Sequence, residues 1–126
     1  MSSGPGPILV VDDDPDILYA LSEALSEEGF SVQVAQNGQE ALDLIGEAPP
    51  ALILLDLMMP VMDGREFGSR IRSSPDLANI PIIVLSAGRD ALSTAEDLDA
   101  AGYLGKPFDL SALLEMTHSA VSSLPG

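Results

Sequence analysis

Short apolar segments alternate with longer segments of mixed polarity along most of this chain. Residues 8–11 and 51–55 are apolar without alternation, a pattern typical of strands that helices cover on both faces. Residues 31–35, 80–85 and 103–105 predict three further strands. We therefore expect five short strands in one buried sheet.

The segments that follow these strands carry apolar residues at helical spacing. Asp14 and Pro15 predict the start of the first helix, as its cap and first residue, and Gly29 predicts its end. The predicted helices cover residues 15–28, 38–48, a short stretch near 67–71, 91–98 and 110–121.

Strands that alternate regularly with helices indicate an α/β domain. We expect a doubly wound fold of five βα units over residues 7–121, with a parallel sheet and helices on both faces. Residues 1–6 read as a flexible tail, and residues 122–126 as a frayed end.

Composition narrows the class of protein. The 126 residues include no cysteine, which excludes disulfides and thiolate chemistry, and no apolar run is long enough to cross a membrane. Because no signal peptide is recognisable at the N-terminus, we expect a cytoplasmic protein. The net charge of −15 would repel phosphate backbones, so we expect no nucleic-acid binding by this chain itself.

Polar side chains stand at the carboxyl ends of four predicted strands. Asp12 and Asp13 follow the first strand, Asp56 follows the third, Ser86 the fourth, and Lys106, the only lysine, the fifth. Because the carboxyl ends of parallel strands share one edge of a sheet, we expect these groups to converge there.

Three converging carboxylates favour a hard divalent cation such as Mg²⁺, which prefers oxygen ligands. One oxygen of Asp56 would remain available as a nucleophile, and the Lys106 ammonium and the Ser86 hydroxyl would surround a transferring phosphoryl group. Taken singly, each of these residues could be an ordinary turn, cap or surface residue. Asp14 is assigned to that role, and the prediction depends on the joint pattern.

Four segments resemble the receiver domain of two-component response regulators, the CheY-like family with a flavodoxin-like fold. They are Ile-Leu-Val-Val-Asp-Asp-Asp-Pro at 8–15, Leu-Leu-Asp-Leu-Met-Met-Pro-Val-Met-Asp-Gly at 54–64, Ile-Val-Leu-Ser-Ala at 83–87, and Tyr-Leu-Gly-Lys-Pro-Phe at 103–108. The resemblance extends over about residues 7–121.

The resemblance implies roles for the residues at the strand ends. Asp56 would accept a phosphoryl group from the phosphohistidine of a sensor histidine kinase or phosphotransfer protein. Mg²⁺ would be bound by Asp13, by Asp12 mainly through water, by Asp56 and by the backbone carbonyl of Met58. Lys106 would pair with Asp56 and the phosphate.

Further residues would transmit the signal. Ser86 would hydrogen-bond the phosphate, Tyr103 would turn inward as Ser86 moves, and the Lys106–Pro107 bond would be cis. The surface from about residue 90 to 121 would report the change to a downstream protein, to an output domain absent from this chain, or to a second copy in a homodimer. Met1 and the compact C-terminal end slightly favour a single-domain regulator. The kinase would meet the first helix and the loop around Pro107.

This chain departs from the family pattern in places. The stretch between Ser86 and Lys106 is short, so the fourth helix is expected to be short or displaced. In the family, polar side chains at the positions of Met58 and Gly88 can orient the water that hydrolyses the acyl phosphate. Methionine cannot orient water and glycine has no side chain, so we predict slow self-dephosphorylation. The single histidine, His118, is interpreted as a helix-surface residue rather than a relay residue.

We expect the phosphorylated switch to turn over no external substrate. Two other classes of protein are alternatives to it. A receiver-fold interaction module without phosphorylation typically lacks an acidic residue, the acceptor or the lysine, and this chain keeps them all. A haloacid-dehalogenase-like phosphatase needs a second aspartate two residues after the nucleophile, where this chain has Met58.

Overall fold

The computed structural model describes residues 6–57, 62–87 and 91–122, and the structural statements below refer to these residues. Strands and helices alternate along the chain as the sequence predicts. The strands are β1 (Ile8–Val11), β2 (Val32–Ala35), β3 (Leu52–Asp56), β4 (Ile82–Ser86) and β5 (Gly102–Gly105), and the helices are α1 (Pro15–Glu27), α2 (Gly38–Glu47), α3 (Gly64–Ser73), α4 (Ala91–Asp97) and α5 (Leu110–Ser122).

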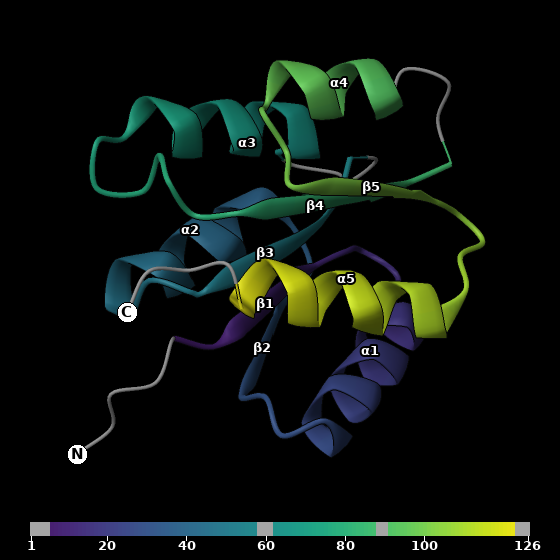
Figure 1. Cartoon of the computed structure of the whole chain (residues 1–126). Coiled ribbons are helices and arrows are strands. Elements are labelled where there is room, and N and C mark those ends of the chain that lie inside the picture. Colours follow the sequence, from purple (N-terminus) through teal and green to yellow (C-terminus); the bar gives the residue numbers. More distant parts are fainter. Residues whose placement is uncertain (1–5, 58–61, 88–90, 123–126) are drawn as a thin grey trace.

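The five strands form one parallel sheet in the order β2-β1-β3-β4-β5 (Figure 1). The chain winds outward from β1 to β2 and then crosses β1 to continue in the opposite direction with β3. Open α/β sheets bind their ligands at such a reversal, beyond the carboxyl ends of the two strands that flank it, which here are β1 and β3. The predicted doubly wound flavodoxin-like fold is confirmed.

Side chains alternate between the two faces of the sheet and divide the core into two clusters. Leu9, Val11 and Ile53 face α2, α3 and α4, while Ile8 and Val10 face α1 and α5. Figure 1 shows the same division, with α1 and α5 together on one side of the strands. Coverage on both faces explains why β1 is apolar throughout, and why β3 and β4 are apolar up to their last residues, Asp56 and Ser86.

The ends of the helices follow the predicted signals. The Asp14 side chain caps α1 by accepting a hydrogen bond from the Asp16 N–H, with Pro15 as the first helical residue. Gly29 ends this helix with a φ of 95°, a left-handed conformation that glycine adopts without steric cost. Asn37 and Asp63 cap α2 and α3 in the same way.

Several element boundaries differ from the prediction. Strand β4 begins at Ile82 rather than Ile80, because the Ile80 N–H closes a turn onto the Leu77 carbonyl and Pro81 has no N–H to donate. Ser31 lies just outside β2, and α5 includes Ser122.

Within the described part of the chain, α4 covers the seven residues Ala91–Asp97. The Lys106–Pro107 bond is cis, which confirms the expectation from the resemblance. Among the described residues, no helix has the length and apolar character that a membrane span needs.

Candidate functional site

Asp12 lies at the carboxyl end of β1 and is 1% exposed, which is unusual for a carboxylate. Two partners hold its side chain. One oxygen, Oδ1, accepts a hydrogen bond from the Asp14 N–H at 2.9 Å, and the other, Oδ2, accepts one from Lys106 Nζ at 2.7 Å. Asp12 is thus fixed in orientation by its own turn and by a cation from the far end of the chain.

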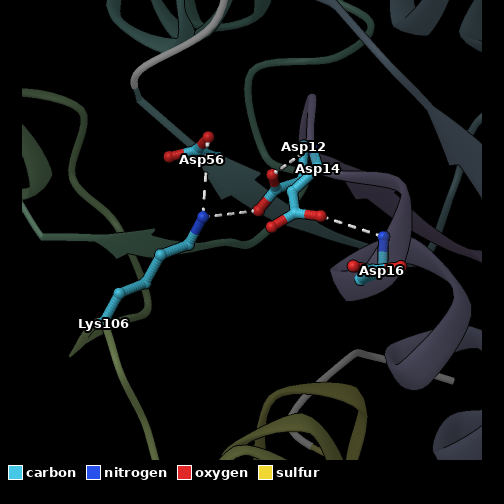
Figure 2. Close-up of polar contacts among 5 residues, drawn as sticks. All are labelled: Asp12, Asp14, Asp16, Asp56 and Lys106. Atoms are coloured by element: carbon cyan, nitrogen blue, oxygen red, sulfur yellow. Dashed lines mark hydrogen bonds and ion pairs between the residues drawn. The ribbon is translucent and has the colours of Figure 1, made fainter.

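Asp56 is the last residue of β3 and is 3% exposed. Lys106, which follows β5, reaches across the edge of the sheet and places Nζ 3.6 Å from Asp56 Oδ2 (Figure 2). The same nitrogen is closer to Asp12, so the ammonium joins the two buried carboxylates. The resemblance implied that Lys106 pairs with Asp56 and the phosphate, and it did not predict the shorter contact with Asp12.

Asp13 completes a group of three carboxylates with Asp12 and Asp56. One oxygen from each lies within 4.8 Å of the others, and Asp13 is the exposed member of the group. Three carboxylates against one ammonium leave an excess of two negative charges beside an apolar core. The donor atoms are all hard oxygens and the excess charge matches a divalent cation, so these residues fit a Mg²⁺ ion.

The pKa of Lys106 lies above its ordinary value. Burial acts to lower this pKa, but the hydrogen bond and charge of Asp12, followed by the charge and hydrogen bond of Asp56, outweigh the effect of burial. Lys106 therefore stays a cation across the physiological pH range and keeps a positive charge beside Asp56.

Ser86 and Tyr103 lie near the same edge of the sheet. Ser86 is 1% exposed at the end of β4, and its carbonyl accepts the Lys106 N–H at 3.2 Å. Tyr103 is partly buried and packs against the core on the α4 side of the sheet. Its hydroxyl lies 3.1 Å from the place that a Cβ of Gly105 would occupy, so the ring extends along β5 toward the carboxyl end of that strand.

The structure brings together Asp12, Asp13, Asp56 and Lys106, with Ser86 on the adjacent strand end. Met58, with its predicted carbonyl ligand, and Gly88 lie outside the described residues. His118 is on the surface of α5, where Nε2 lies 2.8 Å from Glu28 Oε1. That position agrees with its interpretation as a helix-surface residue.

Sequence reasoning missed one neighbour of Asp56. Gly64, at the start of α3, packs directly on the backbone of Asp56 and Leu57, and its N–H donates to the Leu57 carbonyl at 3.1 Å. An Asp-Gly pair is typical of a turn or a helix cap. A turn glycine is a common sequence feature, and nothing in its local context indicates a contact with a strand end.

The fold and the site together define a class of protein. A doubly wound parallel sheet carries buried carboxylates and a lysine at its topological switch point, an arrangement suited to a phosphoryl group and a hard cation. The family model of the response regulator receiver domain matches residues 8–118, and the chain belongs to that family of two-component signalling proteins.

Curated relatives agree with the family. Response regulator MprA of Mycolicibacterium vanbaalenii is 47% identical over 113 residues, which are 87% of this chain and 48% of the relative. Response regulator MprA of Mycobacterium bovis is 46% identical over 110 residues, covering 85% of this chain and 46% of the relative. The chain spans about half the length of these relatives.

Solved structures agree as well. Chemotaxis response regulator CheY4 of Vibrio cholerae superposes with a TM-score of 0.84 at 30% identity, covering 92% of this chain and 98% of that protein. Response regulator TrrA of Thermotoga maritima was solved in complex with Mg²⁺ and BeF. It superposes with a TM-score of 0.81 at 35% identity, and the match covers 91% of this chain and 98% of that protein.

Proposed function

We propose that this domain is a Mg²⁺-dependent switch in which Asp56 accepts a phosphoryl group from the phosphohistidine of a sensor histidine kinase or phosphotransfer protein. One observation carries the proposal: the carboxylate of Asp56 lies at the sheet edge within reach of both a fixed cation, Lys106, and two further carboxylates, Asp12 and Asp13. The family to which the chain belongs supports the same reading.

The transfer needs a nucleophile and neutralisation of phosphoryl charge. An oxygen of Asp56 forms the bond to phosphorus as the phosphorus–nitrogen bond to the kinase histidine breaks, and the electron pair of that bond returns to the imidazole. Lys106, held 3.6 Å from Asp56 Oδ2, offsets negative charge on the phosphoryl oxygens. Ser86, buried at the end of the neighbouring strand, would hydrogen-bond the phosphoryl group afterwards.

Asp12, Asp13 and Asp56 would hold the Mg²⁺ ion, together with the backbone carbonyl of Met58. When bound, the ion supplies positive charge beside the phosphoryl oxygens. The cluster of carboxylate oxygens supports this proposal, and the related TrrA protein was solved with Mg²⁺ and BeF.

An apolar groove of about 560 Å³ beside the site suits the docking of a kinase or phosphotransfer protein. It runs between α1 and the connection from β5 to α5, and its lining includes Ile17, Ala20, Leu21, Pro107 and Phe108 as well as Lys106. Because Lys106 lines the groove and also contacts Asp56, a partner seated there would lie next to the phosphoacceptor.

The signal would leave through the surface formed by α4, β5 and α5. Tyr103 belongs to β5, and Ser86 ends the neighbouring strand β4. Phosphorylation would bias two arrangements of this surface through contacts that differ between them. The signal would pass to a downstream protein or to an output domain, and the protein would act in the cytoplasm.

A phosphorylation assay tests the proposal directly. The chain is incubated with a small acyl phosphate and Mg²⁺, and the expected result is a mass gain of one phosphoryl group that is lost in Asp56→Asn and without Mg²⁺. Asp76→Asn is the matched control, because Asp76 is an exposed aspartate in the turn before β4 and should leave the gain unchanged.

A chain that gains no mass would contradict the switch and support a phosphorylation-independent interaction module. Steady release of product from a phosphate ester would instead indicate a hydrolase.

A further inference from the structure

Gly64 makes a contact that leaves no room for a side chain. A Cβ at this position would lie 2.6 Å from Leu57 Cα and 3.0 Å from the Asp56 carbonyl carbon, and it would also overlap the Asp56 carbonyl oxygen. These are backbone atoms, which cannot rotate away as the end of a flexible side chain can. Close packing in a protein interior makes such an overlap costly, so a side chain here would displace the backbone.

Backbone conformation does not explain this glycine. Gly29 is the only described glycine with a positive φ, and Gly64 is the first residue of α3, after the capping Asp63. An alanine could adopt that conformation, and alanine is the better helix former. The absence of a Cβ at position 64 therefore matters because of the contact with Asp56 and Leu57.

Helix α3 is not free to move away from that contact. Phe67 and Ile71 are fully buried in the core. Further along the helix, Arg72 donates to the backbone carbonyls of Leu98, Ala78 and Ile80 at 2.6, 2.8 and 2.8 Å. With the helix held at its buried face and near its C-terminal end, a displacement at position 64 falls mainly on the Asp56–Leu57 peptide.

We propose that Gly64 is a positioning residue for Asp56: it lets the first turn of α3 press against the strand end and so fixes the carboxylate relative to Asp12 and Lys106. This inference rests on the proposed function. Reactions that depend on near-attack geometry lose on the order of 100-fold for a misplacement of about 1 Å, so even partial displacement should be measurable.

The test compares three glycine-to-alanine variants. A Cβ in Gly64→Ala meets the backbone of Asp56. In Gly68→Ala, also on α3, the nearest contact of the Cβ is the side chain of Leu98, which follows α4. Among the described residues, the Cβ in Gly46→Ala meets nothing within 4 Å. Each is measured for Mg²⁺ affinity by calorimetry and for phosphorylation rate at saturating acyl phosphate. All variants carry Asp99→Gly, which is expected to stabilise the chain because Asp99 has a φ of 53° that glycine adopts without steric cost. Rates are expressed per folded molecule.

We expect Gly64→Ala to slow phosphorylation about tenfold or more at saturating donor and to weaken Mg²⁺ binding severalfold. Gly68→Ala and Gly46→Ala should keep the rate and affinity of the parent chain, even though Gly68→Ala lowers its melting temperature. Gly64→Val should be slower still than Gly64→Ala.

Unchanged kinetics in Gly64→Ala would overturn the positioning role, and so would losses in Gly64→Ala and Gly68→Ala that simply follow their stabilities. Failure of Gly64→Ala to fold would also count against it, because the glycine would then be a folding requirement. If the parent chain takes up no phosphoryl group, the proposed function fails. Mg²⁺ affinity then decides: a weaker value in Gly64→Ala upholds the role of Gly64, and an equal value rejects it.

Discussion

At the scale of single residues, Asp99 carries a backbone conformation that does not suit an aspartate. Its φ is 53°, it lies two residues beyond the end of α4, and its N–H donates to the Glu96 carbonyl at 3.1 Å. Left-handed residues that end helices are usually glycine, because a Cβ there approaches the following carbonyl oxygen. Aspartate tolerates this conformation better than most residues but not as well as glycine.

We therefore expect Asp99→Gly to be more stable than Asp99→Ala by on the order of 1 kcal/mol in the free energy of unfolding. Both variants remove the same negative charge, so their difference isolates the backbone conformation. Urea denaturation followed by far-ultraviolet circular dichroism measures it. Equal stability of the two variants would contradict the prediction.

At the scale of elements, α3 and α4 are joined by arginines of α3. Arg65 Nη2 donates to Thr94 Oγ1 at 2.8 Å, and Arg72 donates to the Leu98 carbonyl and, at 3.3 Å, to the Asp99 carbonyl at the end of α4. Burial lowers the pKa of Arg72, and the nearby charge of Asp99 partly opposes this effect. The guanidinium remains charged, so α4 is tied to α3 by charge-assisted bonds to carbonyls that its own backbone leaves open.

Arg72→Met keeps much of the aliphatic volume but removes these bonds. We expect the free energy of unfolding to fall by about 2–3 kcal/mol, because partly buried carbonyls lose charged donors. Arg70→Met is the matched control. Arg70 is 55% exposed and, among the described residues, forms an ion pair only with Glu66 one turn away, so its loss should change stability by at most about 0.5 kcal/mol.

Thermal and urea denaturation of both variants provide the comparison. A similar, small loss in each would show that Arg72 does not hold the two helices together.

At the scale of the whole molecule, charge is distributed unevenly. The net charge is −15, and three of the five cations, Arg65, Arg70 and Arg72, belong to α3. Within residues 91–122, which the structure describes throughout, the exposed charged side chains other than His118 are Glu96, Asp97, Asp99, Asp109 and Glu115, and Lys106 is engaged by Asp12 and Asp56. The surface of α4, β5 and α5 is therefore acidic.

Two copies meeting through this surface would bring like charges together, as a symmetric contact places the same patch on both sides. We expect any homodimer of the phosphorylated chain to be weak at low ionic strength and to strengthen as salt rises to about 0.5 M, where screening acts within about 4–5 Å. Sedimentation equilibrium at several salt concentrations measures this. A dimer that weakens with added salt would contradict the prediction and indicate pairing of opposite charges.

Much of the fold could be predicted because burial is visible in local patterns. The unbroken apolar runs at 8–11 and 51–55 reflect strands covered on both faces, and the cap at Asp14 uses chemistry within a few residues of the chain. Boundaries that depend on neighbouring segments were less predictable. The start of β4 at Ile82 is an example, because a turn onto Leu77 withdraws the Ile80 N–H from the sheet.

The sequence by itself determined the order of elements, the parallel sheet and the residues at its carboxyl edge. These features follow from periodicity, and from the geometric rule that parallel strands end on one side. The tertiary structure alone decided which of these residues touch. Lys106 lies nearer to Asp12 than to Asp56, Gly64 presses on the Asp56 backbone, and Arg72 binds the end of α4. Such contacts join residues up to 94 positions apart. They depend on strand register and helix packing, which no local pattern specifies.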